Sequence, residues 1–175
     1  ANLHKWAWAP RSSGILWVRS DRQSSIRPLV ESWGLDRGFT AEFDWPGTRD
    51  PSAHLAAPAA IALLHEWGFE AICNYNHQLA WRGAQHLAEQ WGTEWRVDEA
   101  LIGTMATVTV PGVLGTSSDE AQTLRDRLLY EEQIEVQVHS WRRQIFVRIS
   151  AQIYNDMEDV ERLAAAVLRA QQRTS

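Results

Sequence analysis

The hydrophobic pattern of the chain changes its period near residue 93, and this change limits the possible folds more than any other feature. From about Phe69 to Trp91, apolar side chains return every three or four residues, as on one face of a long helix. From Met105 to Pro111, apolar and polar residues alternate, as in a strand with one buried face. A long helix followed by alternating strands and helices predicts a small sheet that is covered by helices.

Turn and capping residues predict the other elements of this second half. Ser118 or Asp119 can cap a helix, because a short polar side chain accepts a hydrogen bond from the free amides of the first turn. Two more strands are expected around the polar turn at residues 140–143. In chain order, the elements expected after residue 93 are strand 105–111, helix 118–131, strands 136–138 and 145–149, and helix 157–171. This order predicts an α+β domain.

The first half of the chain carries fewer periodic signals. The short apolar run at residues 14–18 follows turn residues and predicts a buried strand. Residues 19–49 are rich in glycine, arginine and serine, which predicts loops with at most short helices or strands. Asp50 and Pro51 form a good helix start, and we expect that helix to end at Gly68.

Composition excludes several classes of function. The 17 basic and 22 acidic residues leave a formal net charge of −5, so the chain has no positive field that would attract a nucleic acid. No apolar run reaches the roughly 18 residues that a membrane span needs, so no membrane partner is expected. The six histidines show no metal-ligand spacing, which predicts no metal site. The single Cys73 cannot form an internal disulfide and favours a reducing, cytoplasmic setting.

Lys5 is the only lysine of the chain, so chemistry that needs a side-chain amine has one candidate. A lysine amine can form a Schiff base with a carbonyl group when its surroundings lower its pKa. Taken alone, a lysine near an N-terminus is more often a solvated charge. The context of this one is unusual, because His4 precedes it, Trp6 follows it, and the spacing Pro10-x-x-x-Gly14 leads into the apolar run.

Three ordered segments resemble the class V aminotransferase-like enzymes, which are pyridoxal-phosphate proteins of fold type I, and most of all the isopenicillin N epimerase-like branch. The segments are Asn2-Leu3-His4-Lys5-Trp6 with Pro10 and Gly14, then Trp45-Pro46-Gly47-Thr48-Arg49-Asp50-Pro51-Ser52, then Val147-Arg148-Ile149-Ser150 with Tyr154-Asn155. The resemblance covers essentially the whole chain. It implies an α/β to α+β fold made of the end of a large cofactor-binding domain (1–68), a connecting helix (69–92) and a small C-terminal α+β domain (93–175).

The resemblance also implies a role for particular residues. Lys5 would hold pyridoxal 5'-phosphate as a Schiff base and would then move the α-proton of an amino-acid substrate, with His4 beside it. The Gly47 amide and the Thr48 hydroxyl would bind the cofactor phosphate of the neighbouring subunit, which implies a homodimer with a shared site. Arg148 would bind the substrate α-carboxylate through its planar guanidinium.

The same residues have plainer interpretations. Arg148 can point outward from a strand with one wet face, and the pair Gly47-Thr48 is common in turns. Cysteine desulfurases share this fold and use a cysteine on a loop, which here corresponds to about residues 112–118 and contains no cysteine. Cys73 lies instead in the long helical pattern, where a packed thiol is expected, so this route of desulfurase chemistry is disfavoured.

The family also carries, before its lysine, a phosphate loop, a residue that stacks on the cofactor ring and an aspartate that pairs with the ring nitrogen. These 175 residues include none of them. We expect the chain to be the C-terminal portion of a longer enzyme that binds the cofactor poorly by itself, and the alternative is a product that has lost its catalytic half. Three functions follow: a pyridoxal-phosphate enzyme that performs epimerisation, transamination or carbon–sulfur cleavage on an amino acid; a non-catalytic remnant or interaction module of the same fold; and an unrelated α+β binding domain.

Overall fold

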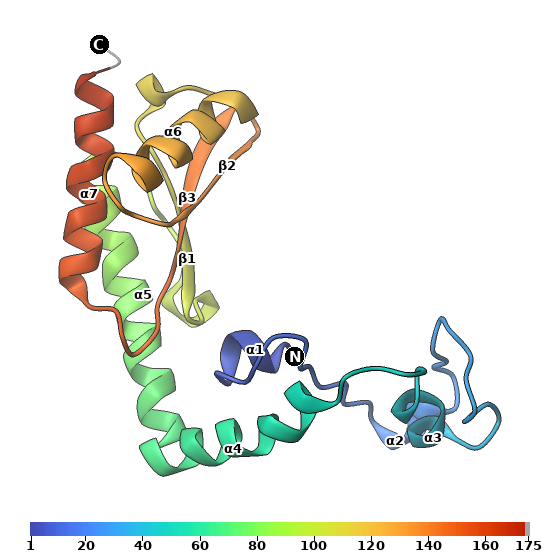
Figure 1. Ribbon diagram of the computed structural model, residues 1–175. Coiled ribbons are helices and arrows are strands. Elements are labelled where there is room, and N and C mark those ends of the chain that lie inside the picture. The colour runs from blue at the N-terminus through green and yellow to red at the C-terminus, as the bar shows by residue number, and fades with distance from the viewer. Residues whose placement is uncertain (174–175) are drawn as a thin grey trace. The chain divides into compact units, whose positions relative to one another are not determined.

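The computed structural model describes residues 1–173, which form two compact units with a boundary after Gly68 (Figure 1). The first unit contains α1 (Leu3–Trp6), α2 (Ser20–Gln23), α3 (Phe39–Asp44) and α4 (Ser52–Trp67). The second unit contains α5 (Phe69–Trp91), β1 (Met105–Thr109), α6 (Ser118–Tyr130), β2 (Gln137–Trp141), β3 (Gln144–Ser150) and α7 (Met157–Gln172), with 3-10 turns at Glu99–Leu101 and Gly112–Leu114. The second unit has the expected mixture of helices with a short sheet.

The sheet of the second unit has three antiparallel strands in the order β1-β3-β2. The register places Val108 and Val138 opposite Val147 of the central strand. These side chains point toward one face, where α5 and α6 pack against the strands and α7 packs against both helices. Figure 1 shows α5 and α7 side by side. Period-two alternation therefore gives the sheet one dry face and one open face.

The core of this unit is tightly packed where α5 crosses the sheet. Gly83 of α5 lies against Ile149 of β3 and Val160 of α7, and a Cβ added there would come within 3.0 Å of the first and 3.2 Å of the second. Val147 and Leu128 are fully buried in the same core. The glycine in this helix interior therefore serves the close approach of three elements rather than a turn.

Helix α6 begins with a capping box. The Ser117 hydroxyl accepts a hydrogen bond from the Glu120 amide, and the Glu120 carboxylate accepts from the backbone amides of Thr116 and Ser117. The bonds that the carboxylate accepts, from the Thr116 amide first and then from the Ser117 hydroxyl and amide, lower the pKa of Glu120 from 4.5 to about 2. The sequence prediction of Ser118 or Asp119 as the cap is wrong, by one position for the nearer of the two, because only Ser117 lies three residues before the glutamate that completes the box.

The buried strand expected at residues 14–18 is absent, and this prediction is wrong. Ile15 and Leu16 are more than half exposed, Trp17 is 78% exposed, and no strand occurs in the described residues of the first unit. The Ile15 backbone instead pairs with Ala1, whose terminal ammonium donates to the Ile15 carbonyl at 2.7 Å. An apolar run forms a strand only where other strands can complete its hydrogen bonds.

The expectation of short helices between residues 19 and 49 is confirmed by α2 and α3. The Glu42 side chain of α3 is buried and forms an ion pair with Arg27, which also lies 3.5 Å from Asp36. A buried carboxylate needs such a partner, because its desolvation would otherwise be unfavourable. The pair joins α3 to the loop that precedes it.

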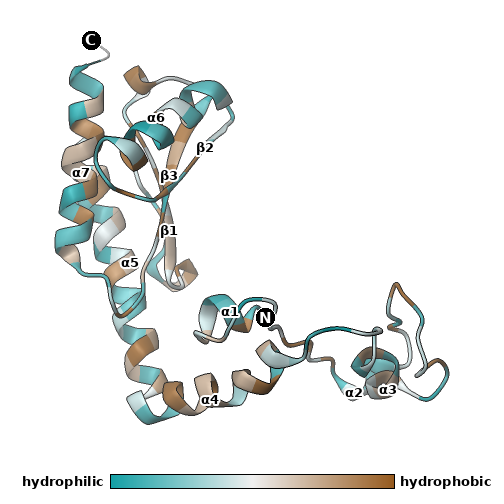
Figure 2. Ribbon diagram, viewed as in Figure 1, coloured by the Kyte–Doolittle hydropathy of each residue, from teal (hydrophilic) through white to brown (hydrophobic). Residues whose placement is uncertain are grey.

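Helix α4 starts as the sequence predicts. Asp50 accepts hydrogen bonds from the Ser52 backbone amide and hydroxyl, and Gly68 ends the helix at a φ of +89°. Apolar residues dominate the helix, as the hydropathy colours show (Figure 2), yet its only buried residues are Ala57 and Leu64. None of the described helices is long and apolar enough to cross a membrane.

Candidate functional site

Lys5 lies on α1, a single helical turn, and its side chain is exposed. No residue within 1–173 forms an ion pair with it, so its amine is available to a ligand. The turn is held in place by the segment that follows it, because the Ile15 amide donates to the Ala1 carbonyl at 2.8 Å and the Ala9 amide donates to the Leu3 carbonyl at 3.2 Å. Residues 1–15 thus form a closed loop that presents the Lys5 side-chain amine.

His4 is half-buried beside Lys5, and its ring is oriented by the same loop. The ring Nδ1 lies 3.0 Å from the Ser13 carbonyl oxygen, so this nitrogen carries a proton and donates. Ser13 is itself buried, and its hydroxyl donates to the Pro10 carbonyl at 2.7 Å. The spacing from Pro10 to Gly14 therefore has a local purpose, because it builds the turn that holds the imidazole.

Gly47 and Thr48 lie in the loop between α3 and α4. Gly47 has a φ of +118°, which favours glycine, and a Cβ there would meet no atom within 4 Å. Thr48 is exposed, and its hydroxyl has no hydrogen-bond partner among the described residues. The pair could therefore offer a backbone amide and a hydroxyl to an anion.

Arg148 occupies the middle of the central strand β3 and faces away from the core. It is exposed, and the register places it opposite Thr107 of β1 and Gln137 of β2. Its guanidinium has no ion pair or hydrogen bond with the part of the chain that the structure describes. Strand β3 therefore has one solvent-exposed face, as expected if Arg148 is only a surface residue. An exposed, unpaired guanidinium can, however, also bind the carboxylate of a ligand.

Aromatic rings lie beside Arg148 on this open face. Phe146 stacks on His139 with ring centroids 5.8 Å apart and lies 6.3 Å from the ring of Trp141. The Arg142 guanidinium lies over the Trp141 ring at 4.2 Å. The sequence did not single out this cluster as a site, although period-two alternation in both strands would have placed these residues on one face.

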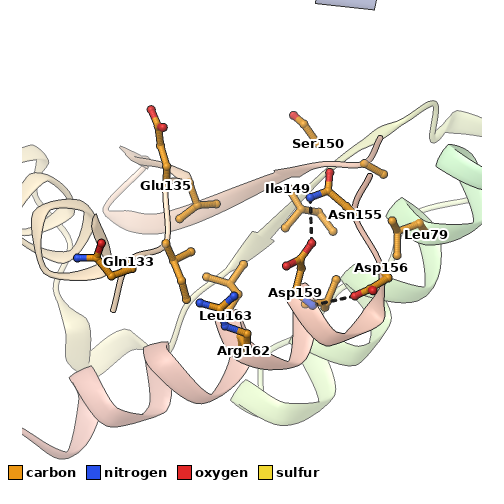
Figure 3. A pocket seen from close by; sticks show the side chains of 14 residues that line it. Leu79, Gln133, Glu135, Ile149, Ser150, Asn155, Asp156, Asp159, Arg162 and Leu163 are labelled. Atoms are coloured by element: carbon orange, nitrogen blue, oxygen red, sulfur yellow. Dashed lines mark hydrogen bonds between the residues drawn. The ribbon is translucent and has the colours of Figure 1, made fainter. Parts of the chain in front are cut away.

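A separate groove opens at the start of α7, and none of the predicted site residues lines it (Figure 3). Its walls are residues 133–136, the end of β3 and the first turns of α7. Two of its carboxylates are engaged within the fold: Asp159 accepts from the Asn155 side chain at 3.0 Å, and Asp156 caps α7. These contacts assign Asp156 and Asp159 to helix capping and loop closure.

The five predicted site residues belong to different units. His4, Lys5, Gly47 and Thr48 lie in the first unit and Arg148 lies in the second, so their joint geometry stays a prediction. Between residues 1 and 173, no group of three or more histidine, cysteine, aspartate or glutamate side chains is placed to hold a metal ion.

Comparison with known proteins adds a family to this geometry. The family model for aminotransferase class-V matches residues 2–163. A protein named as an L-cysteine desulfhydrase from Oryza sativa subsp. japonica is 34% identical over 95% of this chain and 39% of its own length. An L-cysteine desulfhydrase from Arabidopsis thaliana is 32% identical over 95% of this chain and 41% of its own length.

An isopenicillin N epimerase from Streptomyces clavuligerus is 30% identical over 94% of this chain and 44% of its own length. The chain therefore spans about two fifths of the length of the curated relatives it matches. These matches confirm the resemblance seen in the sequence and add the L-cysteine desulfhydrases to it.

Proposed function

The chain belongs to the class V aminotransferase family, and from this premise we propose that it is the C-terminal part of a pyridoxal-phosphate-dependent enzyme that cleaves the carbon–sulfur bond of L-cysteine. One observation carries this proposal: relatives named L-cysteine desulfhydrase match 95% of the chain at up to 34% identity. The aminotransferase class-V family model, which matches residues 2–163, spans all five predicted site residues.

The residues fit the cofactor in three respects. Lys5 offers an exposed amine that no described carboxylate neutralises. The backbone at Gly47 and the hydroxyl of Thr48 are unobstructed donors of the kind that a phosphate accepts. Arg148 is a free guanidinium on an open face, and this group pairs with a carboxylate in a planar, two-bond geometry.

When bound, the cofactor supplies an electron sink for the charge that remains after the α-proton is lost. The Lys5 amine would take that proton from Cα and return it where the reaction requires. The His4 ring, held through Nδ1 by the Ser13 carbonyl, would keep a fixed orientation beside the amine. The Arg148 guanidinium would bind the α-carboxylate and so set which bond at Cα faces the reacting groups.

Epimerisation is the second candidate, and the similarity to an isopenicillin N epimerase is the observation that favours it. Both reactions begin with loss of the α-proton. Carbon–sulfur cleavage then expels the sulfur as hydrosulfide, whereas epimerisation returns the proton to the opposite face of Cα. Transamination, which the family name suggests, is the third candidate. A non-catalytic module of the same fold would perform none of these steps.

We further propose that the enzyme is a homodimer in which the Gly47–Thr48 loop of one subunit binds the cofactor phosphate of the other. The exposure of this loop supports the idea, because it leaves its donors free. The domain organisation proposed is a large-domain end at 1–68, a connecting helix at 69–92 and a small domain from residue 93. We also propose a cytoplasmic setting, for which the single Cys73 is the support.

Borohydride reduction tests the role of Lys5 directly. The chain is incubated with pyridoxal phosphate, reduced and digested, and the labelled amine is located by mass spectrometry. Lys5→Ala is the control, and because the chain has one lysine, the only competing amine is the N-terminus. Because the chain by itself is expected to bind the cofactor poorly, we expect weak label at Lys5 in this sample and saturable label at Lys5 when the sequence is extended upstream. Label that avoids Lys5 in both samples would contradict its role.

Product analysis separates the candidate reactions. The cofactor-loaded protein is given L-cysteine in deuterated water, and hydrosulfide release is measured beside deuterium uptake at Cα. Hydrosulfide release that is lost in Lys5→Ala supports carbon–sulfur cleavage. Deuterium uptake with inversion and without hydrosulfide supports epimerisation instead. A keto acid without hydrosulfide supports transamination, and the absence of all three products would support the non-catalytic module.

A further inference from the structure

Arg148 is the middle member of a row that crosses the whole sheet. The register pairs it with Thr107 on one side and with Gln137 on the other. Residues directly opposite one another in antiparallel strands share a face, with Cβ atoms about 5 Å apart. A hydroxyl, a guanidinium and a carboxamide therefore stand side by side on the open face.

The side chains of Thr107 and Gln137, like the Arg148 guanidinium, have no hydrogen-bond partner within the described part of the chain. Both residues are exposed. The backbone beneath them is nevertheless held, because the Trp95 indole donates to the Thr107 carbonyl at 2.9 Å and packs on Trp81 at 5.0 Å. The side chains of the row are thus free to bind a ligand, while the backbone of β1 at Thr107 is held by Trp95.

The chemistry of a carboxylate fits this row. A carboxylate has about four acceptor positions, and a bidentate guanidinium occupies two of them. A hydroxyl on one side and an amide N–H on the other can fill the remaining two. The next row along the sheet carries Phe146 stacked on His139, so a pair of rings borders one side of the three polar groups.

We propose that Thr107 and Gln137 bind the same substrate α-carboxylate as Arg148, so that the three side chains form one carboxylate site. This inference rests on the proposed function, in which Arg148 receives that group. The row selects substrates with a free carboxylate and discriminates against their amides and esters, because a neutral amide or ester lacks the charge and the second carboxylate oxygen that the guanidinium binds.

Protection of Arg148 from phenylglyoxal, a reagent for guanidinium groups, tests the row in the full chain. The probe is N-acetyl-L-alanine, and its neutral amide N-acetyl-L-alaninamide is the control at matched ionic strength. Cleavage after glutamate yields a peptide of residues 136–158, which contains Arg142, Arg143 and Arg148. The two turn arginines therefore report, in the same peptide, any general change in reactivity.

The variants are Thr107→Val and Gln137→Ala, each with a control of the same residue type in the same sheet. Thr109→Val is the control for the first, because Thr109 lies opposite Phe146 rather than Arg148. Gln144→Ala is the control for the second, because Gln144 lies opposite Trp141 at the far end of the hairpin. The readout is the probe concentration that halves the rate of Arg148 modification, normalised to each variant's rate without probe.

We expect the acid, but not the amide, to protect Arg148 in the unaltered chain. Each row variant should raise the half-protecting concentration of the acid about tenfold. This is the change in affinity expected when one hydrogen bond to a charged group is lost. The two control variants should leave it unchanged. Protection that persists equally in row variants and controls would overturn the three-residue site while leaving Arg148 as the carboxylate residue. Absence of protection in the unaltered chain would overturn both.

Discussion

Replacement of Gly83 by alanine measures how tightly α5 packs on β3 and α7. Two effects oppose each other at this position. Alanine is favoured over glycine in a helix interior by about 1 kcal/mol. The added methyl would, however, come within 3.0 Å of Ile149 Cδ1 and 3.2 Å of Val160 Cγ2, and overpacking a core costs roughly 1–3 kcal/mol. Val160 is branched at Cβ and buried in α7, so it cannot move aside.

We therefore expect Gly83→Ala to lower the free energy of unfolding of the second unit by about 1 kcal/mol. Ile149→Val removes the closest methyl and should by itself cost about 1 kcal/mol. The shortened side chain leaves room for the alanine. The double variant should therefore lose less stability than the two single variants lose together, by more than about 0.5 kcal/mol. Urea denaturation, with amide hydrogen exchange in α5 to isolate this unit, supplies the four values.

Ile145→Val is the matched control, because Ile145 is buried on the same strand but is not among the atoms nearest to the added methyl. Its combination with Gly83→Ala should be additive. Two results would refute the close-approach explanation for the glycine. One is that the effects of Gly83→Ala and Ile149→Val on the free energy of unfolding are also additive. The other is that Gly83→Ala alone raises the free energy of unfolding by the full value of about 1 kcal/mol expected from helix propensity.

Two further predictions concern the hairpin turn and the pH dependence of α6. Arg142 and Arg143 both have positive φ values, of 48° and 60°. Replacing them with Asn and Gly should relieve about 1–2 kcal/mol of backbone strain per residue. The lost contact between the Arg142 guanidinium and the Trp141 ring is worth less than this strain, so the thermal midpoint should rise. An unchanged or lower midpoint would contradict this. The folded pKa of Glu120 is lowered from 4.5 to about 2, so its carboxylate stabilises α6 above the unfolded pKa, and that stabilisation is lost as pH falls from 4.5 toward 2. Exchange protection in the first turn of α6 should fall over this range, and Glu120→Gln should remove the dependence.

The helices were predictable because their signals are local. The three- to four-residue period from Phe69 to Trp91 and the residues around Asp50 and Gly68 lie within the elements that they specify. The strand expected at residues 14–18 failed because strand formation depends on partners elsewhere in the chain, and the first unit supplies none. The α6 cap was misplaced by one or two residues because several neighbouring residues can cap, and only the position of Glu120 decides among them.

The site divides in the same way. Family resemblance pointed to Lys5 and Arg148, and alternation along β3 explains why Arg148 is exposed. The neighbours of Arg148 could not be predicted, because they depend on the register of three strands. The register of β2 on β3 follows from a two-residue turn at Arg142 and Arg143 in a left-handed conformation, which arginine seldom adopts, and the register of β1 depends on a pairing distant in sequence.

The apolar surface of helix α4 affects how a partner could pack against the first unit. A helix with one apolar stripe has a preferred rotation about its axis, because only one orientation buries that stripe. With apolar residues on most sides and only Ala57 and Leu64 buried, α4 gains similar burial at many rotations. Its rotation must then be selected by shape. The small side chains of its six alanines allow a close approach, and the exposed ring of Pro58 adds a rigid feature that a partner surface would have to fit.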